Sequence, residues 1–294
     1  MFPHPFRAKL HRARPPHRSL LHLSHRSGRP PSPLRILKFI VNALRRVEGD
    51  SYVTLNARIY SFLLWGLTNP KVLSPAHTLR QMIRIGVEAL PMASLVALSV
   101  GFILAMQAST ELGKLGANSF IPDLVSLSLL RELGPLLIAI IVVGRSGSAV
   151  AAELGTMKVN EEIEALKVMA ISPVRFLVIP RYLALMIMLP ILTVFGNCVG
   201  LAGGWAVCVG TLDMTSSFYI THAVQRPEVW DLYSGLIKSA VFAHLIITIA
   251  CYQGLGVTGG AEGVGRATTA SVVYSILWII IADAALTGLF FFAL

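Results

Sequence analysis

Charged residues in or beside long apolar segments are the strongest chemical signal in the sequence, and four are candidate functional groups: Arg131, Glu132, Lys238 and Asp283. An isolated charge near the centre of a bilayer costs at least about 2.5 kcal/mol, so each needs a partner or a function. Arg131 and Glu132 point in different directions on a helix and need separate partners. Two interpretations stay open. A Lys238–Asp283 ion pair locks two helices, or the four residues form a polar collar that handles a phospholipid headgroup.

A polar helix is predicted between two apolar segments, over residues 153–170. Its apolar side chains recur at helical spacing and its charged side chains occupy the other face: Val159, Ile163, Leu166 and Ala170 against Glu161, Glu164 and Lys167. Glu164 and Lys167 are three residues apart and can form an ion pair. The pattern fits a helix that docks on a partner protein or one that lies on lipid headgroups.

Two glycine-rich stretches are compatible with nucleotide binding only in part. Residues 254–259 match the spacing of a dinucleotide fingerprint, but they follow an apolar span instead of a β-strand. Residues 260–267 lack the Lys and Ser/Thr of a phosphate-binding loop, since Arg266 and Ala267 stand there. No catalytic residue, metal site or cofactor is predicted in this chain, and any ATP hydrolysis must occur in a separate subunit.

Three motifs follow one another in the middle of the chain: residues 131–135 (RELGP), 144–149 (GRSGSA) and 152–159 (AELGTMKV). Together they resemble the MlaE-like permeases of the Mla/MCE type of ABC transporter, which moves lipid across a bacterial envelope. The resemblance covers about residues 52–294. It implies that the polar helix is a coupling helix that docks into a groove of a separate ATPase. The candidate coupling residues are Glu153, Met157, Val159, Glu161, Ile163 and Leu166.

The resemblance also implies partners and cargo. A homodimer with an apolar chamber would exchange phospholipid with a periplasmic MCE-domain protein, and a STAS-domain protein often accompanies the ATPase. Such a system maintains envelope lipid asymmetry. An ATP-independent transporter, a membrane scaffold and a chloroplast-envelope lipid permease remain alternatives. The lack of broken-helix inverted repeats in the sequence argues against a secondary carrier.

Composition predicts an all-α integral membrane protein, because 54% of the 294 residues are hydrophobic and only 14% are charged. An interfacial helix should precede the spans, with one apolar face: Leu79, Met82, Ile83, Val87 and Leu90. Five spans are predicted at about 91–109, 133–151, 182–208, 236–253 and 271–294. Lys and Arg are more frequent on the N-terminal side of the membrane, which predicts a cytoplasmic N-terminus and a C-terminus on the opposite side. The resemblance implies that this membrane is the bacterial inner membrane, with the C-terminus in the periplasm.

Small residues in the third span predict close helix packing. Gly196, Gly200 and Gly204 form overlapping GxxxG units, which can serve packing within one subunit or across a dimer. His244 is interpreted as a hydrogen-bonded packing residue. The three cysteines show neither metal-binding spacing nor an even disulfide set, and we interpret them as small buried residues: Cys198, Cys208 and Cys251.

The first fifty residues form a separate, basic segment that holds most of the net charge of +10. Rich in His and Pro, it has too little apolar surface to fold alone and is predicted to be disordered. A transit peptide or a misassigned start codon are alternatives. The predicted domains are therefore a tail over 1–50 and a permease domain over 51–294. No nucleic-acid partner is expected, because nothing downstream resembles a nucleic-acid-binding domain.

Overall fold

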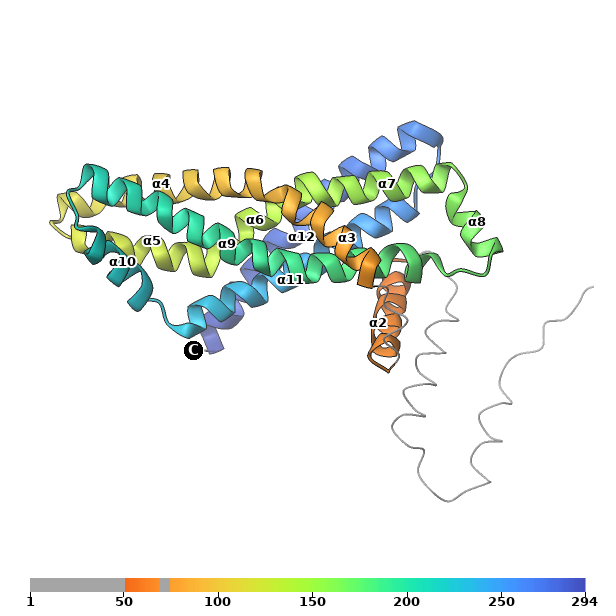
Figure 1. Ribbon diagram of the computed structural model, residues 1–294, viewed down its shortest axis with the longest axis horizontal. Coiled ribbons are helices and arrows are strands. Elements are labelled where there is room, and N and C mark those ends of the chain that lie inside the picture. The colour runs from red at the N-terminus through yellow and green to blue at the C-terminus, as the bar shows by residue number, and fades with distance from the viewer. Residues whose placement is uncertain (1–50, 69–74, 294) are drawn as a thin grey trace, which may run out of the picture.

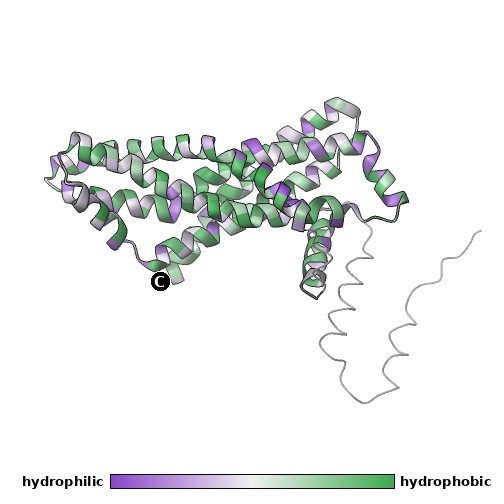
Figure 2. Ribbon diagram, viewed as in Figure 1, coloured by the Kyte–Doolittle hydropathy of each residue, from purple (hydrophilic) through white to green (hydrophobic). Residues whose placement is uncertain are grey.

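The computed structural model describes residues 51–68 and 75–293, and the predicted tail over 1–50 lies outside these ranges. The described residues form helices and no β-strand. Five helical segments among them are long and apolar enough to span a membrane: Pro75–Lys114, Asn118–Val159, Val174–Thr211, Val229–Leu255 and Gly260–Phe292. The spans run along the long axis of the molecule (Figure 1), and apolar residues dominate them (Figure 2). The predicted all-α, five-span membrane fold is confirmed.

Most spans are built from several consecutive helices. The first contains α3 (Pro75–Ile85), η2 (Val87–Ala89) and α4 (Leu90–Lys114). The second contains η3 (Asn118–Phe120), α5 (Ile121–Ser128), η4 (Leu129–Leu133), α6 (Gly134–Val142), η5 (Val143–Gly147) and α7 (Ser148–Val159). After α8 (Glu162–Val168) come η6 (Val174–Val178), α9 (Ile179–Thr211), α10 (Ser216–Gln225), α11 (Val229–Leu255) and α12 (Gly260–Ala293). We call the two ends of the bundle the α8 end and the α10 end, after the short helices that lie there (Figure 1).

The interfacial region differs from the prediction. Leu79 and Ile83 on α3 are half exposed, as expected for a helix at the membrane surface, but α3 also packs against α9 and leads into the first span. An additional helix, α2 (Tyr52–Thr68), was not predicted. It runs across the direction of the bundle near the α8 end (Figure 1). Its orientation suits a helix that lies in the headgroup layer.

Glycines allow the first and third spans to approach closely. A Cβ atom on Gly101 would lie 1.8 Å from the carbonyl oxygen of Gly200, and one on Gly203 would lie 2.3 Å from that of Leu98. Gly196 and Gly204 also face side chains at short distance, those of Ile138 and Tyr219. These contacts are all within one chain. Gly101 and Gly203 are the tightest positions on the two helices, and the sequence analysis did not single them out.

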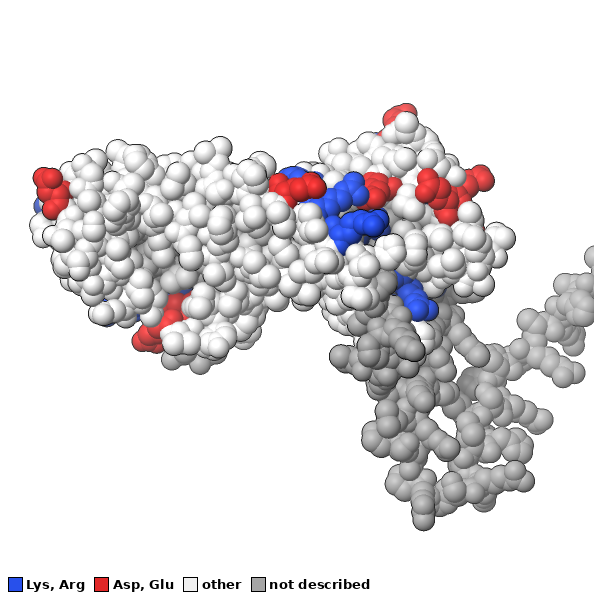
Figure 3. Space-filling view, in the orientation of Figure 1, with Lys and Arg blue, Asp and Glu red and all other residues white. Residues whose placement is uncertain are grey.

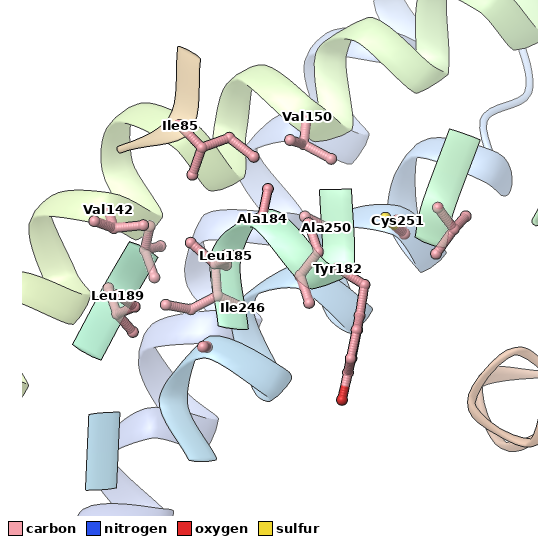
Figure 4. Close-up of a cluster of buried hydrophobic side chains, with 14 of the residues drawn as sticks. Ile85, Val142, Val150, Tyr182, Ala184, Leu185, Leu189, Ile246, Ala250 and Cys251 are labelled. Carbon is pink, nitrogen blue, oxygen red and sulfur yellow. The ribbon is translucent and has the colours of Figure 1, made fainter. Parts of the chain in front are cut away.

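Buried apolar side chains of α6, α7, α9 and α11 form the main core at the α8 half of the bundle (Figure 4). Leu185, Leu189 and Ile246 are almost fully buried there. Because lipid tails are as apolar as these side chains, the core holds the spans together mainly by van der Waals packing. Of the three cysteines, Cys208 and Cys251 are buried, whereas Cys198 is exposed on the third span, contrary to the prediction.

Candidate functional site

A cluster of charged side chains lies inside the spans, centred on Lys238 of α11. The Lys238 side chain is only 1% exposed, and its ammonium group donates to the carboxylate of Glu132. It also lies 3.0 Å from Oδ1 of Asp283 and donates to the hydroxyl of Thr287 at 2.7 Å. An ammonium group has three N–H donors, so these three oxygens account for its capacity. Lys238 therefore ties η4, α11 and α12 together.

Arg131 takes a different partner from Glu132. Its Nε donates to Oδ1 of Asp231 at 2.5 Å. Asp231 is buried in the first turn of α11, where its other oxygen accepts from the backbone N–H of Glu228 at 2.8 Å. The prediction that adjacent charges need separate partners agrees with this geometry. Half of the Arg131 side chain stays exposed, at 53%, so this guanidinium can reach a further anion.

The four predicted collar residues thus separate into two groups. Glu132, Lys238 and Asp283 meet in one cluster, whereas Arg131 joins Asp231, which lies roughly 10 Å from Lys238 along α11. Arg131 and Glu132 both belong to η4, a π-helical segment. A π-helix is wider than an α-helix and often occurs at functional sites, and here it carries two neighbouring charges that reach different partners.

Asp231 completes the pair with Arg131 and Thr287 completes the cluster around Lys238, and the sequence analysis missed both. Each lies at a helical spacing from one of the predicted collar residues. Asp231 precedes Lys238 by seven residues, and Thr287 follows Asp283 by four, so each lies on the same helix face as its neighbour. A search for polar residues at these spacings would have identified them.

A second group of ion pairs lies at the α8 end, where charged side chains gather on the face drawn in Figure 3. Glu153 of α7 accepts from Arg84 of α3 at 3.0 Å and pairs with the buried Arg181 of α9 at 3.1 Å. Arg145 of η5 donates to Glu88 at 2.7 Å. Three spans are therefore linked through Glu153, which the sequence analysis had assigned to the coupling helix.

The predicted helix over 153–170 is two helices. The chain turns at Asn160 and Glu161 between α7 and α8, and Glu161 has a positive φ of 60°. The turn removes the continuous apolar stripe, because Val159 ends α7 whereas Ile163 belongs to α8. One-dimensional periodicity cannot detect such a break, since both halves keep helical spacing.

The apolar side chains of the coupling segment point mainly toward the chain itself. Ile163 is 3% exposed and belongs to the core, and Met157 and Leu166 pack against that core. Within the predicted stripe, Ile163 is therefore covered by the chain itself, whereas Val159 at the end of α7 is 39% exposed. The most exposed large apolar residues of α8 and its end are Val168 at 88% and Met169 at 60%.

Glu164 holds the turn between α7 and α8 together. Its carboxylate contacts Lys158 and lies 2.8 Å from Lys167, so the predicted Glu164–Lys167 pair is confirmed. Hydrogen bonds from the two lysines lower the pKa of the Glu164 carboxyl from 4.5 to about 2. The lowered pKa means that the pairs stabilise the turn fully above about pH 4.5 and lose this effect as pH falls toward 2.

His244 lies among aromatic side chains, as a packing residue would. Its Nδ1 is 3.2 Å from the Tyr182 hydroxyl and its Nε2 is 3.5 Å from that of Tyr60. These contacts join α11 to α9 and to α2. No group of acidic, His and Cys side chains that could hold a metal ion occurs among residues 51–68 and 75–293.

Comparison with known proteins places this geometry in a family. The model of the family described as Permease MlaE matches residues 78–289. The chain belongs to the MlaE permease family. The match includes the charge cluster around Lys238 and the whole α7–α8 segment. Family membership makes the chain a multi-pass membrane subunit of the ABC permease type.

Several relatives of this chain are named as permeases, and one of them is an MlaE protein. A probable ABC transporter permease protein of Rickettsia prowazekii is 42% identical over 213 residues, which cover 72% of this chain and 82% of the relative. The intermembrane phospholipid transport system permease protein MlaE of Haemophilus influenzae is 34% identical over 78% of this chain and 90% of its own. Protein TRIGALACTOSYLDIACYLGLYCEROL 1, chloroplastic, of Arabidopsis thaliana is 38% identical over 73% of this chain and 61% of its own.

Proposed function

We propose that this chain is the permease subunit of an ABC transporter that moves phospholipid between the bacterial inner membrane and a periplasmic MCE-type carrier. A homodimer of the chain encloses the lipid, and a separate ATPase, in some systems with a STAS-domain protein, supplies the energy. Membership of the MlaE family supports this function, as does the name of the Haemophilus influenzae relative. The observation that carries the proposal is a half-exposed Arg131 beside a buried charge cluster inside the spans.

The charged residues inside the spans have two different roles, one structural and one in binding lipid. Acyl chains need only apolar surface, but a phosphate drawn into a low dielectric needs a cation with hydrogen-bond donors. Lys238 is surrounded by Glu132, Asp283 and Thr287 and acts as a lock between helices. Arg131 keeps exposed surface and binds the headgroup phosphate, and Asp231 holds its guanidinium in place.

The α8 end couples the chain to the ATPase. In the proposed orientation this end lies in the cytoplasm, with the N-terminus on the same side and the C-terminus in the periplasm. Val168 and Met169 are exposed apolar side chains of the kind that enter a groove on a partner. Ion pairs from Glu153 to Arg84 and Arg181 join α7 to the first and third spans. A displacement of α8 by the ATPase is thereby transmitted to these spans.

We expect Val168→Asp, combined with Met169→Asp, to release the ATPase while the chain stays folded, because both side chains are exposed before docking. Loss of a central apolar contact typically costs about 2 kcal/mol or more, so the loss of even one of the two should lower copurification at least about 30-fold. The measurement is the amount of ATPase that copurifies with the tagged permease from detergent extracts. Val224→Asp, at an exposed valine of α10, is the matched control.

Ile163→Asp should affect folding of the permease itself and not ATPase docking alone. Because Ile163 is buried in the core, its replacement should lower the folded yield of the permease itself. Retention of the ATPase by the folded Val168→Asp, Met169→Asp variant at wild-type level would contradict docking through this surface.

A chloroplast-envelope permease is the second candidate function. The Arabidopsis thaliana relative is named chloroplastic, and the first fifty residues of this chain are basic, poor in acidic residues and contain several serines. Import of a fusion of residues 1–50 to a reporter into isolated chloroplasts would favour this candidate over the bacterial one. A reporter that stays outside would favour the inner-membrane location.

A further inference from the structure

A pocket of about 590 Å³ lies at the α8 end, away from the charge cluster in the spans. Its walls come from four parts of the chain: α2, the α7–α8 segment, the stretch that leads to η6, and the turn between α11 and α12. The pocket does not belong to the proposed lipid path through Arg131. Its position beside α2, which runs across the bundle, corresponds to the headgroup layer of one leaflet (Figure 1).

The lining combines positive charge with apolar surface. Arg58, Lys158 and Lys167 contribute cationic side chains, and none of the described residues that line the pocket is acidic. Glu164 outside the lining pairs with both lysines and holds them side by side, and among the described side chains it leaves three cations against one carboxylate. Leu55 forms part of the apolar wall together with further residues: Ile163, Val174, Leu255 and Val257.

We propose that this pocket binds the headgroup and upper acyl chain of an anionic phospholipid from the leaflet at the α8 end. A phosphodiester can accept from the cations, and the adjoining apolar wall suits the start of an acyl chain. Ser51 lines the pocket, so the preceding residues of the chain are nearby in sequence. Residues 1–50 as a whole are strongly basic, although Glu48 and Asp50 stand directly before Ser51, and the three cations disfavour most of this segment as an occupant.

The pocket also adjoins the segment that docks the ATPase. Ile163, Lys158 and Lys167 line it, and Val168 follows Lys167 directly. A bound headgroup would neutralise charge on the α7–α8 turn and fix its position. Lipid composition in that leaflet would then influence how α8 meets the ATPase, a consequence that rests on the proposed function. The binding site itself does not.

The test is photolabelling of the full chain in nanodiscs by phosphatidylglycerol that carries a diazirine near the top of one acyl chain. Labelled peptides are identified by mass spectrometry. We expect label in α8 and in residues 253–258, and about tenfold less label in the Arg58→Gln, Lys167→Gln double variant, since each cation contributes a charged hydrogen bond. Ser172→Trp, which fills the pocket without changing its charge, should lower labelling as well.

Controls separate this site from unspecific attraction. Arg266→Gln removes an exposed cation at the same end that does not line the pocket, so its labelling should equal that of the wild type. Three outcomes would overturn the proposal: wild-type labelling in both pocket variants, an equal loss in Arg266→Gln, or equal labelling by a phosphatidylcholine probe. Complete competition by millimolar inorganic phosphate would assign the cations to free phosphate and overturn the lipid as occupant. Labelling requires neither ATPase nor transport, so it can fail or succeed independently of the proposed function.

Discussion

Replacing Lys238 with Met should nearly abolish recovery of folded protein. The change strands the carboxylates of Glu132 and Asp283 beside each other in the spans. Loss of one member of a buried charge pair typically costs about 3–5 kcal/mol, and here two partners lose the same cation. The measurement is the fraction of extracted protein that elutes as a single folded species in mild detergent. Lys114→Met is the control, because Lys114 is exposed and its ion pair with Glu111 lies at the surface.

A variant in which the cluster around Lys238 carries no charge can show whether the cluster links the helices or takes part in lipid transport. Lys238→Met with Asp283→Leu is insufficient, since it leaves Glu132 without its cation. The triple variant that adds Glu132→Gln should recover folding, as apolar replacement of a whole buried ion cluster often does. Arg131 is intact in this variant, so we expect transport to recover with folding.

Arg131→Ala, in contrast, should fold and lose transport. Full transport by Arg131→Ala would contradict its role at the headgroup.

The second large effect is expected from Gly101→Val. Any Cβ atom at this position would lie 1.8 Å from the carbonyl oxygen of Gly200, and the contact is backbone on both sides, so no side chain can rotate away. Overpacking of this kind typically costs about 1–3 kcal/mol, and a clash with rigid backbone belongs at the upper end or beyond it. The first and third spans should separate, with a fall in thermal stability measured by loss of monodisperse protein on heating.

Gly210→Ala is the matched control for this clash. Gly210 lies in α9, as Gly200 does, but a Cβ atom there meets nothing within 4 Å. Alanine is a better helix former than glycine, so the control should be as stable as the wild type or slightly more so. Equal stability of Gly101→Val and Gly210→Ala would show that the two spans do not pack as described.

The sequence predicts the spans well because the physics behind them is local. A stretch of about twenty apolar residues must be helical in a bilayer, whatever its neighbours are. The same reasoning locates Lys238 and Asp283, since charges are expensive in such stretches. The first span was predicted to begin at about residue 91, and α4 begins at Leu90.

Contacts between distant segments could not be predicted in the same way. Asp231 as the partner of Arg131 and Arg181 as a partner of Glu153 depend on how the spans are arranged in three dimensions. The direction in which Ile163 points depends on the turn at Asn160 and Glu161. Neither position holds glycine or proline, but Asn160, the C-cap of α7, is a conventional signal for a helix end that the sequence analysis did not use.

The most direct test of the account is purification of the tagged full-length chain from its native membrane, with mass spectrometry of the proteins and lipids that accompany it. A lipid permease of the ABC type should retain an ATPase subunit in comparable amount, together with phospholipid. The Arg131→Ala variant should retain the ATPase and lose most of the phospholipid. A folded wild-type chain that copurifies with neither an ATPase nor phospholipid would contradict the account.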